Sequence, residues 1–151
     1  MKFQCHETVT GDLVQYKFEG YIDESAVFPK SRPAAKVEID LGGVKGINSV
    51  GTRTWCEWLG KIRPPAAVTL DKCPVIFVKN MGNVLGMVTP NTKVQSFYVP
   101  FVNKTGKRKD VLVTRDQVSP EGEVLVKGIN DEQGGPMQPD VFKAYFGFLR
   151  R

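Results

Sequence analysis

A strand-like run that passes into a helix-like run constrains the fold of this chain most. Residues 34–41 (AAKVEIDL) alternate between apolar and charged side chains, which is typical of a strand with one buried face. From about residue 49 to residue 61 the apolar side chains recur at helical spacing, and Pro64 and Pro65 end the pattern. A strand followed at once by an amphipathic helix favours an α/β fold in which the helix crosses over a sheet.

Similar patterns on both sides of this pair predict the rest of a sheet. Two alternating runs, residues 2–10 and 13–21, flank the turn at Gly11-Asp12 and predict an antiparallel hairpin. Further strands are predicted at residues 66–70 and 93–99, with a helix at 74–84 between them. The resulting strand–helix–strand–helix–strand order predicts a mixed sheet with crossover helices.

The pattern changes near residue 100, where we predict the boundary between two domains, residues 1–99 and 100–151. The second part has two short strand-like runs, at residues 110–114 and 123–127, and a glycine-rich turn. It closes with an amphipathic helix over residues 139–151. Four apolar residues are expected to share one face of this helix: Phe142, Tyr145, Phe146 and Leu149.

Composition favours a cytoplasmic protein without a membrane span. The net charge is +5, which permits but does not require a partner such as nucleic acid. The apolar runs are too short to cross a membrane, and the N-terminal stretch lacks the apolar region of a secretory signal. The chain has 3 cysteines without regular spacing, which argues against a disulfide framework.

The residue types needed for catalysis are not brought together by spacing. His6, the only histidine, follows Cys5 in a predicted strand, where adjacent side chains point to opposite faces and cannot form a dyad. Neither a GxxxxGK[ST] loop nor a GxGxxG loop after a strand is present. The sequence therefore predicts no enzymatic activity and no cofactor.

The stretch VEIDLGGVKGINSVGTRTWCEWL resembles the core motif of STAS domains, the fold of anti-sigma factor antagonists. In a bacterial STAS-like group the helix begins with Asn-Ser-x-Gly-x-Arg-x-Trp, which matches Asn48, Ser49, Gly51, Arg53 and Trp55. The resemblance extends over residues 2–100. It implies an α/β STAS-like fold and a non-enzymatic regulatory or scaffolding role in signalling, through protein–protein interaction.

In the STAS family, the serine or threonine that matches Ser49 is the phosphoacceptor of a partner-switching kinase. The resemblance therefore makes Ser49 a candidate phosphoacceptor, and the expected partner is a kinase, an anti-sigma-like protein or another signalling protein. Phosphorylatable members usually carry aspartate before the acceptor, where this chain has Asn48. The partner-binding surface is expected at six residues: Asn48, Ser49, Gly51, Thr52, Arg53 and Glu57.

Simpler structural roles are also expected for several of these residues. Ser49 is suited to cap the N-terminus of the helix by accepting a backbone N–H. Arg53 and Glu57, four positions apart, are suited to form a surface ion pair. Trp55 and Trp58 are expected to pack against the sheet.

The second part of the chain resembles a small zinc ribbon that often follows the STAS-like domain in this group. The resemblance rests on Pro100-Phe101, on the Gly-Gly-Pro-Met run at 134–137 and on the aromatic helix. The positions of the knuckle cysteines are occupied by Asn103, Gly106, Asn130 and Gln133, which cannot replace thiolate or imidazole ligands. We therefore predict no zinc, and expect the aromatic helix to hold this extension.

Two other functions stay open at the level of sequence. The basic run KTGKRK at residues 104–109, with Phe101 nearby as a stacking surface, would suit nucleic acid. A pocket between the sheet and the C-terminal aromatic helix would suit a small ligand.

Overall fold

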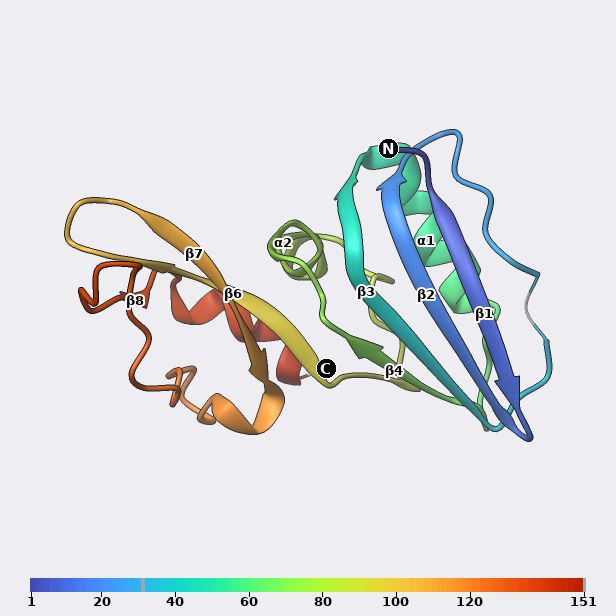
Figure 1. Ribbon diagram of the computed structural model, residues 1–151. Coiled ribbons are helices and arrows are strands. Elements are labelled where there is room, and N and C mark those ends of the chain that lie inside the picture. Colours follow the sequence, from blue (N-terminus) through green and yellow to red (C-terminus); the bar gives the residue numbers. More distant parts are fainter. Residues whose placement is uncertain (31, 151) are drawn as a thin grey trace.

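The computed structural model describes residues 1–30 and 32–150, with only the backbone of Arg150, and contains two β-sheets (Figure 1). The first sheet has the order β1-β2-β3-β4-β5. Its strands are β1 (Gln4–Thr10), β2 (Leu13–Ile22), β3 (Lys36–Ile47), β4 (Ala67–Asp71) and β5 (Thr92–Val94). β1 runs antiparallel to β2, and the other neighbours are parallel. The predicted α/β class with a mixed sheet is confirmed.

Two helices form the crossovers of this sheet. Helix α1 (Ser49–Gly60) joins β3 to β4, and helix α2 (Val75–Asn83) joins β4 to β5. In Figure 1, α1 lies behind β1 and β2, whereas α2 lies between this sheet and the C-terminal elements. No helix within the described residues is long and apolar enough to cross a membrane.

Alternation along β2 decides which face of the sheet is covered by α1. Val14, Tyr16 and Phe18 are buried, while Gln15 and Lys17 between them are exposed. Trp55 and Trp58 of α1 pack on this face, as predicted, and the rings of Phe18 and Trp58 have centroids 5.4 Å apart. Burial of such aromatic side chains is the main force that attaches the helix to the sheet.

Strand β3 is longer than predicted. The expected end at residue 41 is wrong because Gly42 and Gly43 resemble a strand terminator, yet the strand continues through them to Ile47. The pairing of β2 with β3 shifts register at this point. A Cβ on Gly43 would lie 2.7 Å from Cγ of Glu19 on β2, so glycine permits the close passage of the two strands.

The second sheet is joined to the first by a nearly continuous extended segment. Its strands are β6 (Ser96–Val102), β7 (Arg108–Thr114) and β8 (Gln138–Pro139), in the order β7-β6-β8. Only Gln95 separates β5 from β6. Cys73, just after β4, donates its N–H to the carbonyl of Ser96 and accepts the N–H of Tyr98, at 3.2 and 2.9 Å. The predicted domain boundary at residue 99 therefore falls within a strand that starts beside the first sheet.

The C-terminal segment differs from its prediction in two respects. The run at 123–127 is not a strand and forms only an isolated bridge between Val118 and Val124, because glycines with positive φ at 122 and 128 turn the chain at both ends. The final helix forms as the 3₁₀ segment η2 (Lys143–Arg150), preceded by the short 3₁₀ segment η1 (Arg115–Gln117).

The aromatic residues that pack also differ from the prediction. Phe146 and Phe148 are buried, and Phe148 lies 5.0 Å from Phe97 of β6 between ring centroids. Phe142, predicted to pack, precedes the helix and is 89% exposed.

A hydrogen-bonded clasp occupies the place where the resemblance put the zinc knuckles. The Asn103 side chain donates to Oδ2 of Asp131 at 2.8 Å and accepts the N–H of Lys107 at 2.9 Å. Oδ1 of Asp131 accepts the N–H groups of Gln133 and Gly135, at 2.9 and 2.8 Å. Within residues 1–30 and 32–150, no group of three or more His, Cys, Asp or Glu side chains is arranged to hold a metal ion.

This clasp is expected to weaken in acid. The Asn103 hydrogen bond, followed by that from Gly135, lowers the pKa of Asp131 below its usual range. A lowered pKa in the folded state means that the stabilisation is present above the ordinary carboxyl pKa of about 3.9 and is lost as the pH falls through the lowered value. Hydrogen exchange should show less protection of the Gln133 and Gly135 amides at pH 2.5 than at pH 5.

Asp131→Asn should abolish this difference, whereas Asp116→Asn, at an exposed carboxylate whose pKa is also lowered, should leave it intact. Equal protection at both pH values in the unaltered protein would contradict the role of the clasp.

Candidate functional site

The first turn of α1 rests on the carboxyl end of β2. The N–H of Asn48 donates to the carbonyl oxygen of Ile22 at 3.2 Å. A Cβ on Gly51 would lie 1.9 Å from that same oxygen, far inside van der Waals contact. Glycine at position 51 therefore lets the helix approach the strand end, and this contact sets the position of the whole candidate site.

Asn48, rather than Ser49, caps α1. Its Oδ1 accepts the N–H of Gly51 at 2.8 Å, and its Nδ2 donates to Oε2 of Glu24 at 2.8 Å. Ser49 is the first helical residue and is exposed, and its hydroxyl makes no hydrogen bond within the part of the chain that the structure describes. The prediction of Ser49 as N-cap is wrong because the Asn48 side chain already satisfies the amide within its reach.

Two of the six predicted partner-binding residues are mainly structural. Gly51 is buried against β2, and Thr52 is buried with its Oγ1 donating to the carbonyl of Asn48 at 2.9 Å. Asn48, Ser49, Arg53 and Glu57 are exposed. The accessible part of the predicted surface is therefore smaller than the motif.

A groove of about 480 Å³ opens between the start of α1 and the end of α2. We call it the α1–α2 groove. It brings together Asn48, Ser49, Thr52 and Arg53 with residues that the sequence did not implicate. Its lining is Ile47, Asn48, Ser49, Thr52, Arg53, Cys56, Asn80, Val84 and Leu85. Leu85 stands at its rim with 86% of its surface exposed, so the groove combines an apolar wall with one cation and a free hydroxyl.

Glu57 does not belong to this groove. It lines a separate hollow of about 440 Å³ with Trp58 and the loop at Phe28–Lys30. The predicted Arg53–Glu57 ion pair is wrong, since no ion pair joins them in the described part of the chain. Exposed partners gain little from pairing, so both remain solvated, and Arg53 is left as a free cation at the α1–α2 groove.

The cysteines are poor nucleophiles. Burial raises the pKa of Cys5 to about 11, with a further contribution from Glu7. Burial also raises the pKa of Cys56 and that of Cys73. These thiols stay protonated at neutral pH, whereas nucleophilic chemistry needs the thiolate.

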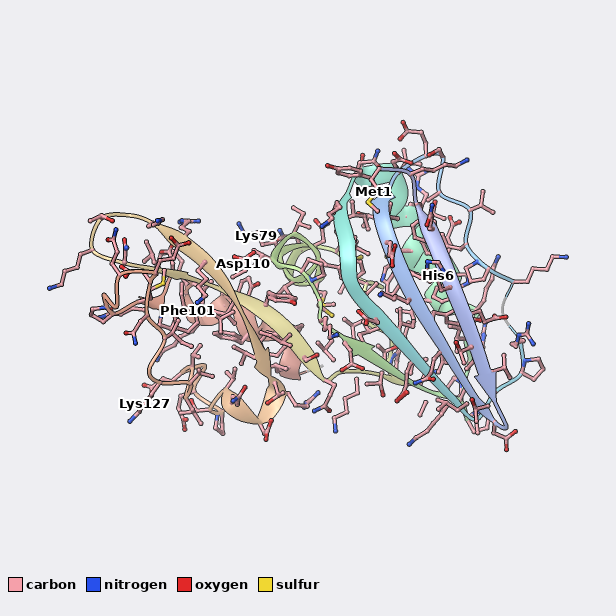
Figure 2. The ribbon with its side chains drawn as sticks, in the orientation of Figure 1. Met1, His6, Lys79, Phe101, Asp110 and Lys127 are labelled. Carbon is pink, nitrogen blue, oxygen red and sulfur yellow. The ribbon has the colours of Figure 1, made fainter. Side chains whose placement is uncertain are left out.

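The basic run at 104–109 forms the tip of the β6–β7 hairpin. Lys107 lies 4.0 Å from Glu132, and Arg108 pairs with Asp140. Phe101, proposed as a stacking surface, points into the second sheet's core and is only 1% exposed (Figure 2). That part of the nucleic-acid hypothesis is wrong, because a base can stack only on an accessible ring.

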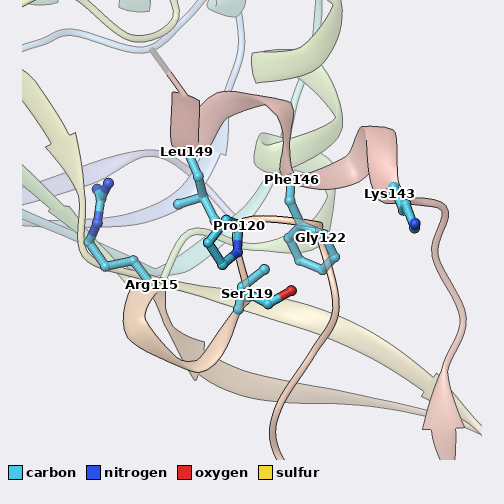
Figure 3. A pocket seen from close by; sticks show the side chains of 8 residues that line it. Arg115, Ser119, Pro120, Gly122, Lys143, Phe146 and Leu149 are labelled. Atoms are coloured by element: carbon cyan, nitrogen blue, oxygen red, sulfur yellow. The ribbon is translucent and has the colours of Figure 1, made fainter.

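The expected ligand pocket between sheet and aromatic helix is filled by the packing of Phe146 and Phe148 on Phe97. A hollow of about 360 Å³ opens instead between η2 and the segment at 115–122 (Figure 3). Arg115 lines it but already donates to the carbonyl of Val94 at 3.0 Å.

Comparison with known proteins does not assign the chain to a family. No protein-family model matches it, and a search of curated proteins finds no match.

The close contact of Gly51 with the carbonyl oxygen of Ile22 can be tested by adding a single methyl group. Gly51→Ala should destabilise the protein by about 1–3 kcal/mol through overpacking, although alanine favours helices by about 1 kcal/mol over glycine. Gly60→Ala, in the last turn of the same helix with no atom within 4 Å of the new Cβ, should be neutral or stabilising. Urea unfolding of both variants checks this, and equal stability of the two would refute the close contact.

Capping by Asn48 predicts an unequal effect of two neighbouring alanine substitutions. Asn48→Ala should lower the free energy of unfolding by about 0.5–2 kcal/mol, because it removes the cap. Ser49→Ala should change it by less than about 0.5 kcal/mol, because no contact is lost. Thermal and urea unfolding would measure both, and a larger loss for Ser49→Ala would restore serine as the cap.

Proposed function

We propose that this protein is a non-enzymatic regulatory or scaffolding module of the STAS type, which binds a signalling protein through the α1–α2 groove. Phosphorylation of Ser49 would control that binding. The mixed sheet with its crossover helices and the motif from Asn48 to Trp55 support the proposal.

The observation that carries the proposal is the free hydroxyl of Ser49. A serine at a helix start usually has a structural reason, namely capping, but Asn48 performs that role here. Ser49 is nevertheless exposed at a groove that also presents Arg53 and Leu85. A kinase would reach this hydroxyl without any local unfolding.

Glu24 supplies the carboxylate that the motif lacks. STAS domains that are phosphorylated usually have aspartate before the acceptor, and here that position is Asn48. The hydrogen bond from Asn48 to Oε2 of Glu24, 2.8 Å long, brings a carboxylate to the same helix start. Aspartate at position 48 would set two carboxylates against each other, so asparagine suits this neighbour.

Phosphorylation would act by charge alone. A phosphate adds a charge of about −1.5 to −2 at neutral pH, and a helix N-terminus tolerates an anion. Arg53 lies one turn further along the helix and contributes a single positive charge to the groove. The groove would change from cationic to anionic while α1 stayed folded, and a partner suited to one state would be repelled by the other.

The proposal is tested by affinity purification from host lysate with three forms of the protein. The unaltered protein and Ser49→Ala should retain the same partner, and Ser49→Asp should lose it. Val50→Asp is the matched control, because it adds the same charge to the same turn at an exposed residue outside the groove. Mass spectrometry of the protein from its host should detect phosphate on Ser49.

The proposal fails if all forms hold the same proteins, or if Val50→Asp disrupts binding as much as Ser49→Asp. The first result would leave Ser49 without a role in binding. The second would show that any negative charge in the first turn of α1 disrupts binding.

A further inference from the structure

Helix α2 has one buried and one exposed face. Phe77, Val78 and Met81 are buried against the core. At 100° per residue the opposite side of the helix carries Ile76, Lys79 and Asn83, all of which are exposed. Lys79 projects beside α2 in the space between the first sheet and the C-terminal elements (Figure 2).

A hollow lies on each flank of this face. The α1–α2 groove reaches α2 at Asn80. On the other flank a hollow of about 400 Å³, which we call the α2–tail hollow, opens between α2 and residues 140–145. Lys79 and Asn83 line this second hollow, so a single helix separates the two depressions.

Each hollow carries one large apolar side chain that is almost fully exposed. Leu85 lines the first and is 86% exposed, while Phe142 lines the second and is 89% exposed. An isolated exposed apolar residue is ordinary, but two at hollows on opposite flanks of one helix give a single surface two apolar anchor points.

The charged side chains that line the two hollows without an ion-pair partner among the described residues are both positive. Arg53 in the α1–α2 groove and Lys79 on the exposed face of α2 form no ion pair in residues 1–30 and 32–150. The one carboxylate that lines the second hollow, Asp140, is paired with Arg108. A binding partner with complementary charge is therefore acidic.

We propose that the exposed face of α2 and its two flanking hollows form one docking surface for an acidic segment of a protein partner. The segment places one apolar side chain in each hollow and carboxylates over Arg53 and Lys79. The two hollows are separated by the width of α2, and a helix is about 10 Å wide. In a helical partner segment this distance corresponds to the rise of about seven residues. This inference rests on the proposed binding role of the α1–α2 groove, and it gives the C-terminal extension a direct part in binding.

The test uses a phage library of random 16-residue peptides selected on the unaltered protein. Enriched peptides should contain aspartate or glutamate between two apolar residues about seven positions apart. The enriched peptides are then synthesised, and their affinities are measured by fluorescence anisotropy. They should bind the Phe142→Ser and Lys79→Glu variants at least about tenfold more weakly than they bind the unaltered protein. Two control variants should bind these peptides as the unaltered protein does. They are Leu125→Ser, at an exposed leucine, and Lys127→Glu, at a lysine that lies far from α2 in Figure 2.

Each result decides the matter. Suppose that Ser49→Asp weakens the binding of the enriched peptides, whereas Phe142→Ser and Lys79→Glu do not. The α1–α2 groove would then remain a binding site, but the proposed extended surface would be overturned. Peptides without acidic residues, peptides equally weakened by the control variants, or no enrichment at all would also overturn it. Enriched peptides indifferent to Ser49→Asp as well would count against the proposed function itself.

Discussion

The contact between Gly51 and the carbonyl oxygen of Ile22 fixes the geometry on which the candidate site depends. Only a residue without a side chain permits this approach, and the N–H of Asn48 bonds to the same oxygen. Once the first turn is held there, Trp55 and Trp58 meet the face of β2, and Ser49 is turned outward. The outward position of the Ser49 hydroxyl is thus a consequence of the contact at Gly51, two residues further along the helix.

A second constraint connects the extension to the same core. β5 and β6 are one extended segment interrupted at Gln95, whose N–H bonds to Leu70 of β4 and whose carbonyl accepts the N–H of Arg115. Because β6 starts beside β4, the second sheet cannot move freely from the first. Helix α2 fills the angle between them, with Phe77 against Trp55, 4.9 Å between ring centroids, and with η2 on its other flank. The surface formed by α2 is therefore built from both parts of the chain.

Local patterns were sufficient for β2 and α1, because one buried face imposes alternation or helical spacing on consecutive residues. They failed where the deciding partner is distant in sequence. The sequence near residue 48 does not indicate that the Asn48 side-chain amide donates a hydrogen bond to Glu24, 24 positions earlier. It also does not indicate that Leu85 lines the same groove. Gly42 and Gly43 predicted a strand end, but their effect is to let β3 pass close to β2. The cap prediction failed by one residue, since serine and asparagine are equally suitable in isolation.

Because different residues cap, seat and pack the start of α1, the proposed charge switch at Ser49 would need no change of fold. Capping, seating and packing are assigned to Asn48, Gly51 and Trp55, none of which would be altered by a phosphate on Ser49. The clasp between Asn103 and Asp131 and the packing of η2 likewise hold the extension independently of the groove. A new negative charge on Ser49 would therefore leave these contacts in place. The electrostatic free energy of the added charge would act mainly on a partner that approaches Arg53 and Leu85. This is the condition for a switch that changes partners while the protein stays folded.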